Sequence, residues 1–212
     1  MNEKNQLGFV HKFIPSEGSK DQNSLTLLLL HGTGGDETDL IPIARMLDIT
    51  NASILSPRGK VIENGMPRYF RRLSEGIFDI EDLKLRTNEL AEFVQNASKT
   101  YALNLNRIVA IGYSNGANIA ASVLLLRPEI LSNAILFRPM IPLVPNTLPK
   151  LSSKRVLISA GLHDPIVASY QTKDLFDLLE KVGAKVSIQW QNSGHELTQR
   201  DIVAARKWLS LL

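Results

Sequence analysis

Cysteine is absent from the 212-residue chain, which excludes disulfide bonds, thiolate metal sites and a cysteine nucleophile. A strong excess of one charge is also missing, because 24 basic and 21 acidic residues leave a net charge of only +3 and form no lysine or arginine block. This balance argues against nucleic acid as a partner. No histidine pair has the H-x-x-H or H-E-x-x-H spacing of a zinc hydrolase. We therefore expect neither a metal nor another cofactor.

Long hydrophobic runs are missing as well. The apolar run at residues 25–30 is interrupted by Thr26 and is far too short to cross a bilayer. The first six residues are polar and lead into no apolar segment of the kind that a signal peptide needs. The sequence therefore predicts no membrane span and a cytoplasmic location.

Apolar residues make up 44% of the chain, enough to fill the core of one domain over residues 1–212. Short apolar runs alternate with segments of helical periodicity, and residues 7–14 resemble an edge strand. The predicted strands cover residues 25–30, 52–56, 108–111, 134–137, 156–159 and 185–190. The predicted helices cover residues 38–47, 80–101, 115–126 and 169–182. The capping box Thr198-x-x-Asp201 predicts the start of a last helix. This alternation predicts an α/β fold with a doubly wound, mostly parallel sheet and helices on both faces.

The pentapeptide Gly112-Tyr113-Ser114-Asn115-Gly116 follows one of these strands and precedes a helix. In a nucleophile elbow, G-x-S-x-G places the serine on a sharp strand-to-helix turn, and glycines flank it because side chains there would collide with nearby backbone. Ser114 is therefore the candidate nucleophile. A simpler interpretation is a serine that only caps the following helix.

A serine nucleophile needs a base and a group that orients the base. Among the four histidines, His195 lies in a loop between the last strand and the last helix, and Asp164 follows the preceding strand. The order Ser114, Asp164, His195 is the order of the α/β-hydrolase fold. Asp164 could instead cap the turn before Pro165, in which case another aspartate such as Asp79 or Asp82 would be the acid.

The remaining histidines have simpler interpretations. We interpret His163, beside Asp164, as structural or as part of a pocket wall, and His11 as a surface residue of the first strand. His31 opens the glycine-rich stretch His31-Gly32-Thr33-Gly34-Gly35, where it would support the loop through hydrogen bonds.

That loop matches the H-G motif that supplies one backbone donor to an oxyanion hole. Thr33 is the preferred donor and Gly34 the second choice, while the N–H of Asn115 would be the other donor. The loop could instead hold a phosphate, but neither G-x-x-x-x-G-K-[ST] nor G-x-G-x-x-G occurs in the chain.

Two loops, at residues 67–78 and 138–144, are candidates for a minimal lid over the site. The candidate substrate-binding residues are Phe70, Met140, Ile141 and Leu143, with Ile166 and Val167 beside Asp164. Ordinary packing beneath long loops explains each of them equally well. Arg68, Arg71 and Arg72 would attract an anionic substrate if they faced it, although a solvated basic face is the simpler interpretation.

With the H-G-T-G-G loop, the G-Y-S-N-G elbow, the G-L-H-D-P-I-V acid loop and the S-G-H-E histidine loop in this order, the chain resembles the phospholipase/carboxylesterase family of α/β-hydrolases, relatives of acyl-protein thioesterases. The stretches at residues 66–73 and 137–140 resemble its bacterial carboxylesterase branch. The resemblance implies the same catalytic and oxyanion-hole residues. Many members have glutamine after the serine where this chain has Asn115, a departure that concerns the substrate rather than the mechanism.

The sequence thus predicts a serine carboxylesterase acting on a small ester or thioester through an acyl-enzyme on Ser114. A lysophospholipase or an acyl-protein thioesterase is the nearest alternative. A peptidase, a lyase using the triad as a base, or a non-catalytic ligand-binding module on the same fold also remain open. The sequence leaves open whether the chain forms a homodimer.

Overall fold

The structure is a computed structural model that describes residues 7–17, 24–49 and 51–212. The polar N-terminal segment, on which the expected absence of a signal peptide depends, lies outside these residues. Among the described helices, none is both long enough and apolar enough to span a membrane.

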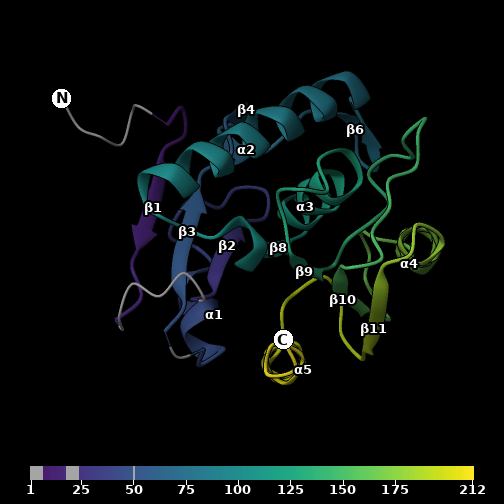
Figure 1. Ribbon diagram of the computed structural model, residues 1–212. Helices are drawn as coiled ribbons and strands as arrows, with labels where there is room; N and C mark the ends of the chain where they lie inside the picture. The colour runs from purple at the N-terminus through teal and green to yellow at the C-terminus, as the bar shows by residue number, and fades with distance from the viewer. Residues whose placement is uncertain (1–6, 18–23, 50) are drawn as a thin grey trace.

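In the described part of the chain, seven strands form one sheet with the order β1-β3-β2-β8-β9-β10-β11 (Figure 1). These strands are β1 (His11–Ile14), β2 (Thr26–Leu30), β3 (Ser53–Pro57), β8 (Ile108–Tyr113), β9 (Asn133–Phe137), β10 (Arg155–Gly161) and β11 (Lys185–Gln191). Only the edge strand β1 pairs antiparallel, and the other neighbours pair parallel. The predicted mostly parallel sheet is confirmed.

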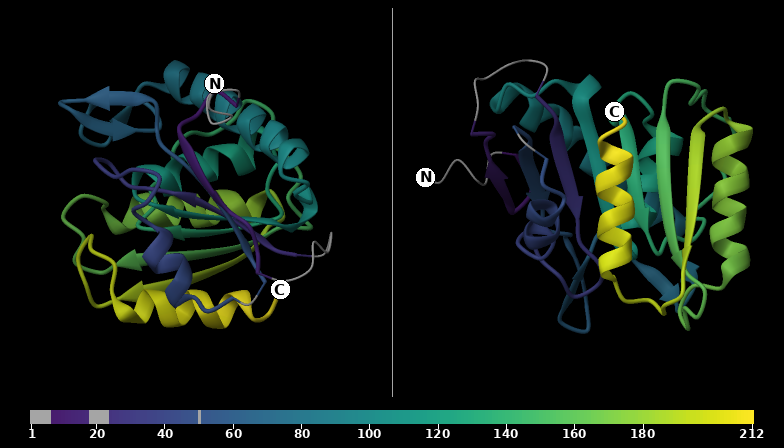
Figure 2. Two further views of the ribbon diagram at one scale, coloured as in Figure 1. Left: turned by 90° about the vertical axis from the view of Figure 1, so that its left-hand side faces the viewer. Right: turned by 90° about the horizontal axis from the view of Figure 1, so that it is seen from below.

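Helices cover both faces of the sheet (Figures 1 and 2). One face carries α1 (Ile41–Met46) and α5 (Gln199–Leu209), and the other carries α2 (Ile80–Thr100), α3 (Asn115–Leu126) and α4 (Ser169–Lys181), while a short 3₁₀ helix (Leu105–Arg107) precedes β8. The run of leucines in β2 is buried on both faces of the sheet: Leu28 and Leu30 belong to one core cluster, whereas Leu27 and Leu29 belong to the other. Alternate side chains of a strand point to opposite faces, so a sheet covered on both sides needs a continuous apolar run.

The stretch after β3 is more regular than the sequence predicts. It folds into two hairpins, one of β4 (Val61–Glu63) with β5 (Met66–Arg68), and one of β6 (Arg72–Ser74) with β7 (Ile77–Phe78). Asn64 and Gly65 both have positive φ, 51° and 79°, as the two central residues of a type I′ hairpin turn require. An Asn-Gly pair is a sequence signal of such a turn, and it was not used to predict the first hairpin.

His11 is buried, so its interpretation as a surface residue was wrong. Its Nδ1 lies 2.8 Å from the carbonyl oxygen of Phe9, and its Nε2 lies 2.7 Å from the hydroxyl of Tyr101. Tyr101 follows α2 and stacks on Phe13 of β1 at 4.0 Å between ring centroids. The end of α2 therefore covers an edge strand that looks solvent-exposed from its sequence alone.

Candidate active site

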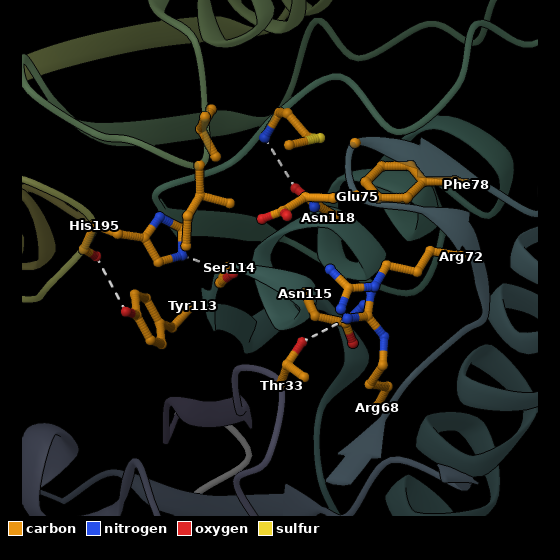
Figure 3. Close-up of a pocket in the computed structure, with 14 residues that line it drawn as sticks. Thr33, Arg68, Arg72, Glu75, Phe78, Tyr113, Ser114, Asn115, Asn118 and His195 are labelled. Atoms are coloured by element: carbon orange, nitrogen blue, oxygen red, sulfur yellow. Dashed lines mark hydrogen bonds between the residues drawn. The ribbon is translucent and has the colours of Figure 1, made fainter. Parts of the chain in front are cut away.

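Four loops meet at one edge of the sheet, and each follows a parallel strand. Thr33 follows β2, Ser114 follows β8, Asp164 follows β10 and His195 follows β11. Because parallel strands end at the same edge, residues far apart in the sequence come together there. Thr33, Ser114 and His195 line one cavity of about 300 Å³ (Figure 3).

Ser114 occupies the turn between β8 and α3 with φ 53° and ψ −113°, a conformation that non-glycine residues rarely adopt. A β-carbon on Gly116 would lie 1.9 Å from the carbonyl oxygen of Leu30, and one on Gly112 would lie 2.5 Å from that of Gly116. Both positions therefore need glycine because backbone, which cannot move aside, fills the space. The turn holds the Ser114 side chain at the cavity, as a nucleophile elbow does.

Ser114, His195 and Asp164 form a hydrogen-bonded chain. The Oγ of Ser114 lies 2.9 Å from Nε2 of His195, and Nδ1 of His195 lies 2.7 Å from Oδ2 of Asp164. The other carboxylate oxygen, Oδ1, accepts backbone N–H groups from Ile166 at 2.8 Å and Val167 at 3.0 Å. A carboxylate at Nδ1 keeps that nitrogen protonated, so Nε2 is left to accept a hydrogen bond from the hydroxyl of Ser114.

The loop that carries His195 is held by the side chain of Arg138, which is fully buried. Its guanidinium donates to the carbonyl oxygens of Gly194 at 3.1 Å and Glu196 at 2.6 Å, and to the hydroxyl of Ser193 at 3.1 Å. The sequence placed Arg138 only at the start of a lid loop. One arginine beside a proline carries no local signal of burial, so this role was missed.

A buried carboxylate balances the charge of Arg138. Asp201, at the start of α5, accepts two bonds from the guanidinium, at 2.8 and 2.9 Å, and one from the hydroxyl of Ser159 at 2.6 Å. It also accepts the N–H of Thr198 at 2.7 Å, as the predicted capping box requires. Burial by itself would raise the pKa of Asp201, but these hydrogen bonds outweigh burial and lower that pKa. The carboxylate is therefore kept ionised opposite Arg138.

The two expected oxyanion donors, Thr33 and Asn115, both line the cavity beside Ser114. Asn115 is the first residue of α3, where backbone N–H groups have no acceptor within the helix. Gly34, the second choice, is not available, because its N–H donates to the carbonyl oxygen of Pro67 at 2.9 Å. The arrangement favours Thr33 over Gly34 as a donor to bound substrate.

His31 supports the same loop from behind. Its Nδ1 lies 2.6 Å from the carbonyl oxygen of Gly32, and its Nε2 accepts the N–H of Gly59 at 2.9 Å. Burial lowers the pKa of His31 below its ordinary value, so the neutral ring is favoured. These bonds make His31 the structural support that the sequence predicts. His163, by contrast, is exposed and lies 2.9 Å from the side-chain oxygen of Asn192.

Half of the expected apolar wall lies at the cavity. Met140, Ile166 and Val167 line it, whereas Phe70, Ile141 and Leu143 do not. Phe70 is fully buried and packs edge-on against Phe78 at 5.0 Å between ring centroids. The N–H of Ile141 donates to Gln171 of α4 at 3.2 Å, which folds its loop onto the core that Ile141 and Leu143 join. Core packing, the alternative considered from the sequence, accounts for these three residues.

The three arginines of residues 68–72 differ in their position relative to the cavity. Arg68 and Arg72 line the cavity, whereas the side chain of Arg71 is 61% exposed and pairs with Asp79. A solvated basic face therefore describes Arg71 alone. The cavity lining also includes residues that the sequence did not single out: Glu75, Gly76 and Phe78, which lie within the candidate lid loop at residues 67–78, and Tyr113 and Asn118. Within the described ranges, no group of three or more histidine or acidic side chains is arranged to hold a metal ion.

Comparison with known proteins places the chain in a family. The phospholipase/carboxylesterase family matches residues 11–212. A sequence relative, "Putative hydrolase MhqD" of Bacillus subtilis (strain 168), is 46% identical over 197 residues, which cover 93% of this chain and 96% of that protein.

Solved structures agree with the family match. The carboxylesterase of Bacillus cereus is 48% identical, with a TM-score of 0.93 over 98% of this chain and 96% of that one. YahD, solved with malic acid, is 36% identical, with a TM-score of 0.86 over 94% of this chain and 98% of that one. With its elbow at the end of β8 and its mostly parallel sheet, the chain belongs to the phospholipase/carboxylesterase family, a family of ester hydrolases with the α/β-hydrolase fold.

Proposed function

We propose that this protein is a serine carboxylesterase that hydrolyses small carboxylic esters or thioesters. The observation that carries the proposal is the hydrogen-bonded chain from Ser114 through His195 to Asp164, with 2.9 and 2.7 Å between the paired atoms. In this assignment Ser114 is the nucleophile, His195 the general base and Asp164 the group that orients the base.

The reaction proceeds in two steps. The Oγ of Ser114 attacks the acyl carbon while its proton passes to Nε2 of His195, and the backbone N–H groups of Thr33 and Asn115 stabilise the oxyanion. The intermediate collapses to an acyl-enzyme as His195 returns the proton to the departing alcohol or thiol. His195 then takes a proton from a water molecule, which attacks the acyl carbon, and passes that proton to the Oγ of Ser114 as the acid is released.

The size of the cavity supports a small substrate. A volume of about 300 Å³ with Met140, Ile166 and Val167 in its wall suits a short acyl group. A lysophospholipase or an acyl-protein thioesterase would need room for a long acyl chain, so we place both behind a carboxylesterase. The carboxylesterase name of the Bacillus cereus relative favours the same order.

The proposal also covers domain organisation, location and cofactors. We propose that residues 1–212 form one α/β-hydrolase domain, that the protein is cytoplasmic, and that it works without a metal or other cofactor. The complete absence of cysteine and the net charge of +3 suit a reducing compartment and a partner other than nucleic acid. A homodimer is compatible with this setting.

The test is the Ser114→Ala variant. We expect it to lose turnover of p-nitrophenyl acetate and labelling by a fluorophosphonate probe, because both reactions need the serine oxygen. Ser153→Ala, which changes an exposed serine outside the cavity, is the matched control and should retain both. Retention of both activities by Ser114→Ala would overturn the assignment.

Two alternatives are distinguished by further measurements. A panel of peptides and esters separates a peptidase from an esterase by the ratio of kcat/KM values. A non-catalytic binding protein on this fold would bind a ligand tightly without being labelled by the probe.

A further inference from the structure

Two guanidinium groups form part of the cavity wall that contains Ser114. Arg68 at the end of β5 has a side chain only 4% exposed, and Arg72 at the start of β6 has one 28% exposed. Arginines are almost never buried without a partner. Both burial and the like charge of Arg72 lower the pKa of Arg68, in agreement with two cations held close together. Such a pair is stabilised by negative charge.

Glu63 supplies part of that charge. Its carboxylate contacts Nε of Arg68 at 3.3 Å, and Nε and Nη2 of Arg72 at 2.8 Å each. Nη1 of Arg68 donates to the hydroxyl of Thr33 at 2.8 Å. Among the described residues, Nη2 of Arg68 and Nη1 of Arg72 then have no hydrogen-bond partner. Glu63 therefore neutralises only one of the two positive charges, and over the described ranges each guanidinium keeps a nitrogen that is free to donate a hydrogen bond.

Asn115 adds a third unused donor. The residue is 3% exposed, and its Oδ1 accepts the N–H of Tyr69 at 2.7 Å. Its Nδ2 is buried and, within the described part of the chain, has no partner. A buried donor left unpaired is unfavourable, so a binding group that accepts from it gains affinity. Figure 3 shows the side chains of Asn115, Thr33, Arg68 and Arg72 converging on one side of Ser114.

The other charge at the cavity limits what this group of donors would bind. Glu75 lies in the turn between β6 and β7, lines the cavity and is exposed. Its negative charge disfavours a doubly charged ligand, and the surplus of Arg68 and Arg72 over Glu63 is one unit. A monoanion matches this balance better than a phosphate dianion. A carboxylate also fits the planar, two-donor geometry of guanidinium groups.

We propose that Arg68, Arg72 and Asn115 form a carboxylate subsite, so that the enzyme prefers small esters that carry a second, free carboxylate over neutral esters of the same size. The inference rests on the proposed function of Ser114, because the subsite is defined relative to the scissile ester. Short half-esters of dicarboxylic acids are the substrate class that it specifies.

Monoethyl succinate and ethyl succinamate test the preference, because they differ only in carboxylate against amide. We expect kcat/KM to be at least about tenfold higher for monoethyl succinate, as charge-assisted hydrogen bonds give. Arg72→Gln should bring the ratio close to one. Arg71→Gln is the matched control, since Arg71 is the neighbouring arginine outside the cavity, and it should keep the wild-type ratio.

Two further comparisons sharpen the charge assignment. Glu75→Gln removes a repelling carboxylate and should raise the ratio about two- to threefold. Ethyl 3-phosphonopropanoate carries a more highly charged group in the same place and should be a poorer substrate than monoethyl succinate. A preference for the phosphonate, or a wild-type ratio near one, would overturn the carboxylate subsite.

Binding to Ser114→Ala separates this inference from the proposed function. By isothermal titration calorimetry, this variant should bind monoethyl succinate more tightly than ethyl succinamate, and equal affinities would overturn the subsite whatever the activity. If wild-type protein hydrolyses neither ester while Ser114→Ala retains the preference, the subsite stands and the esterase assignment fails. Should Arg72→Gln not fold, Arg72→Met, which also removes the charge, repeats the comparison, and an unchanged ratio in whichever variant folds contradicts the inference.

Discussion

Arg138 and Asp201 form a bidentate ion pair in which both side chains are fully buried, with 2.8 and 2.9 Å between donor and acceptor atoms. The pair joins the end of β9 to the start of α5 and lies against the loop that carries His195. It therefore links the stability of the fold to the position of the proposed general base.

Removing the cation should be strongly destabilising. Arg138→Gln leaves the carboxylate of Asp201 buried without its counter-charge, and breaking such a pair costs about 3–5 kcal/mol. Urea denaturation measures the loss, and slower fluorophosphonate labelling should accompany it because the His195 loop loses its supports. Arg200→Gln, at an exposed position one residue from Asp201, is the control and should change stability by less than about 0.5 kcal/mol. A loss below about 1 kcal/mol for Arg138→Gln would contradict this role.

Asp164→Asn should reduce kcat by about 10⁴-fold, the effect of the equivalent change in the protease triad, because the amide favours the wrong histidine tautomer. Steady-state kinetics on p-nitrophenyl acetate measure it. Asp79→Asn and Asp82→Asn are the matched controls, since these carboxylates accept hydrogen bonds from Arg71 instead. A loss of less than tenfold for Asp164→Asn would move the role of the acid to another residue.

Gly116→Ala should both unfold and inactivate the protein. Its β-carbon would lie 1.9 Å from the carbonyl oxygen of Leu30, so strand and helix would have to separate, at a cost of about 3 kcal/mol or more. Gly65→Ala is the comparison, because its β-carbon meets no atom within 4 Å and only its φ of 79° is unfavourable, by about 1 kcal/mol. Equal losses of stability in urea would show that contact with Leu30 is not the cause.

His31 should make the free energy of unfolding depend on pH. Its pKa is lowered in the folded protein, so between that pKa and the unfolded value of about 6.5 the unfolded chain binds more protons. Stability from the neutral ring is thus present above pH of about 6.5 and is lost as the pH falls toward the folded pKa.

Urea denaturation between pH of about 7 and 5 should show this loss in the wild type, and His31→Gln should reduce the slope. His163→Gln, at an exposed ring, should retain it. An NMR titration of His31 in the folded protein provides a second readout that needs no variant. A folded pKa at or above the ordinary value would refute the prediction.

Local patterns predicted much of the fold and the arrangement of the proposed triad. The apolar run of β2 indicated a strand buried on both faces, and its leucines do alternate between two cores. The G-x-S-x-G turn indicated the elbow, and the order of Asp164 and His195 along the chain indicated strand ends that meet. Each of these signals depends only on neighbouring residues or on the order of the strands along the chain. These features could therefore be predicted without knowing which distant residues are in contact.

The sequence by itself thus determined the layered sheet, the elbow at Ser114 and the loops that bring Asp164 and His195 to it. Only the tertiary structure decided which charged and aromatic side chains face the cavity. Phe70 lies in the core, Arg68 lies at the cavity wall, and Arg138 is buried against Asp201, 63 positions away. The burial of a charged side chain depends on a counter-charge and acceptors that folding brings from distant segments, and composition and periodicity do not contain this information.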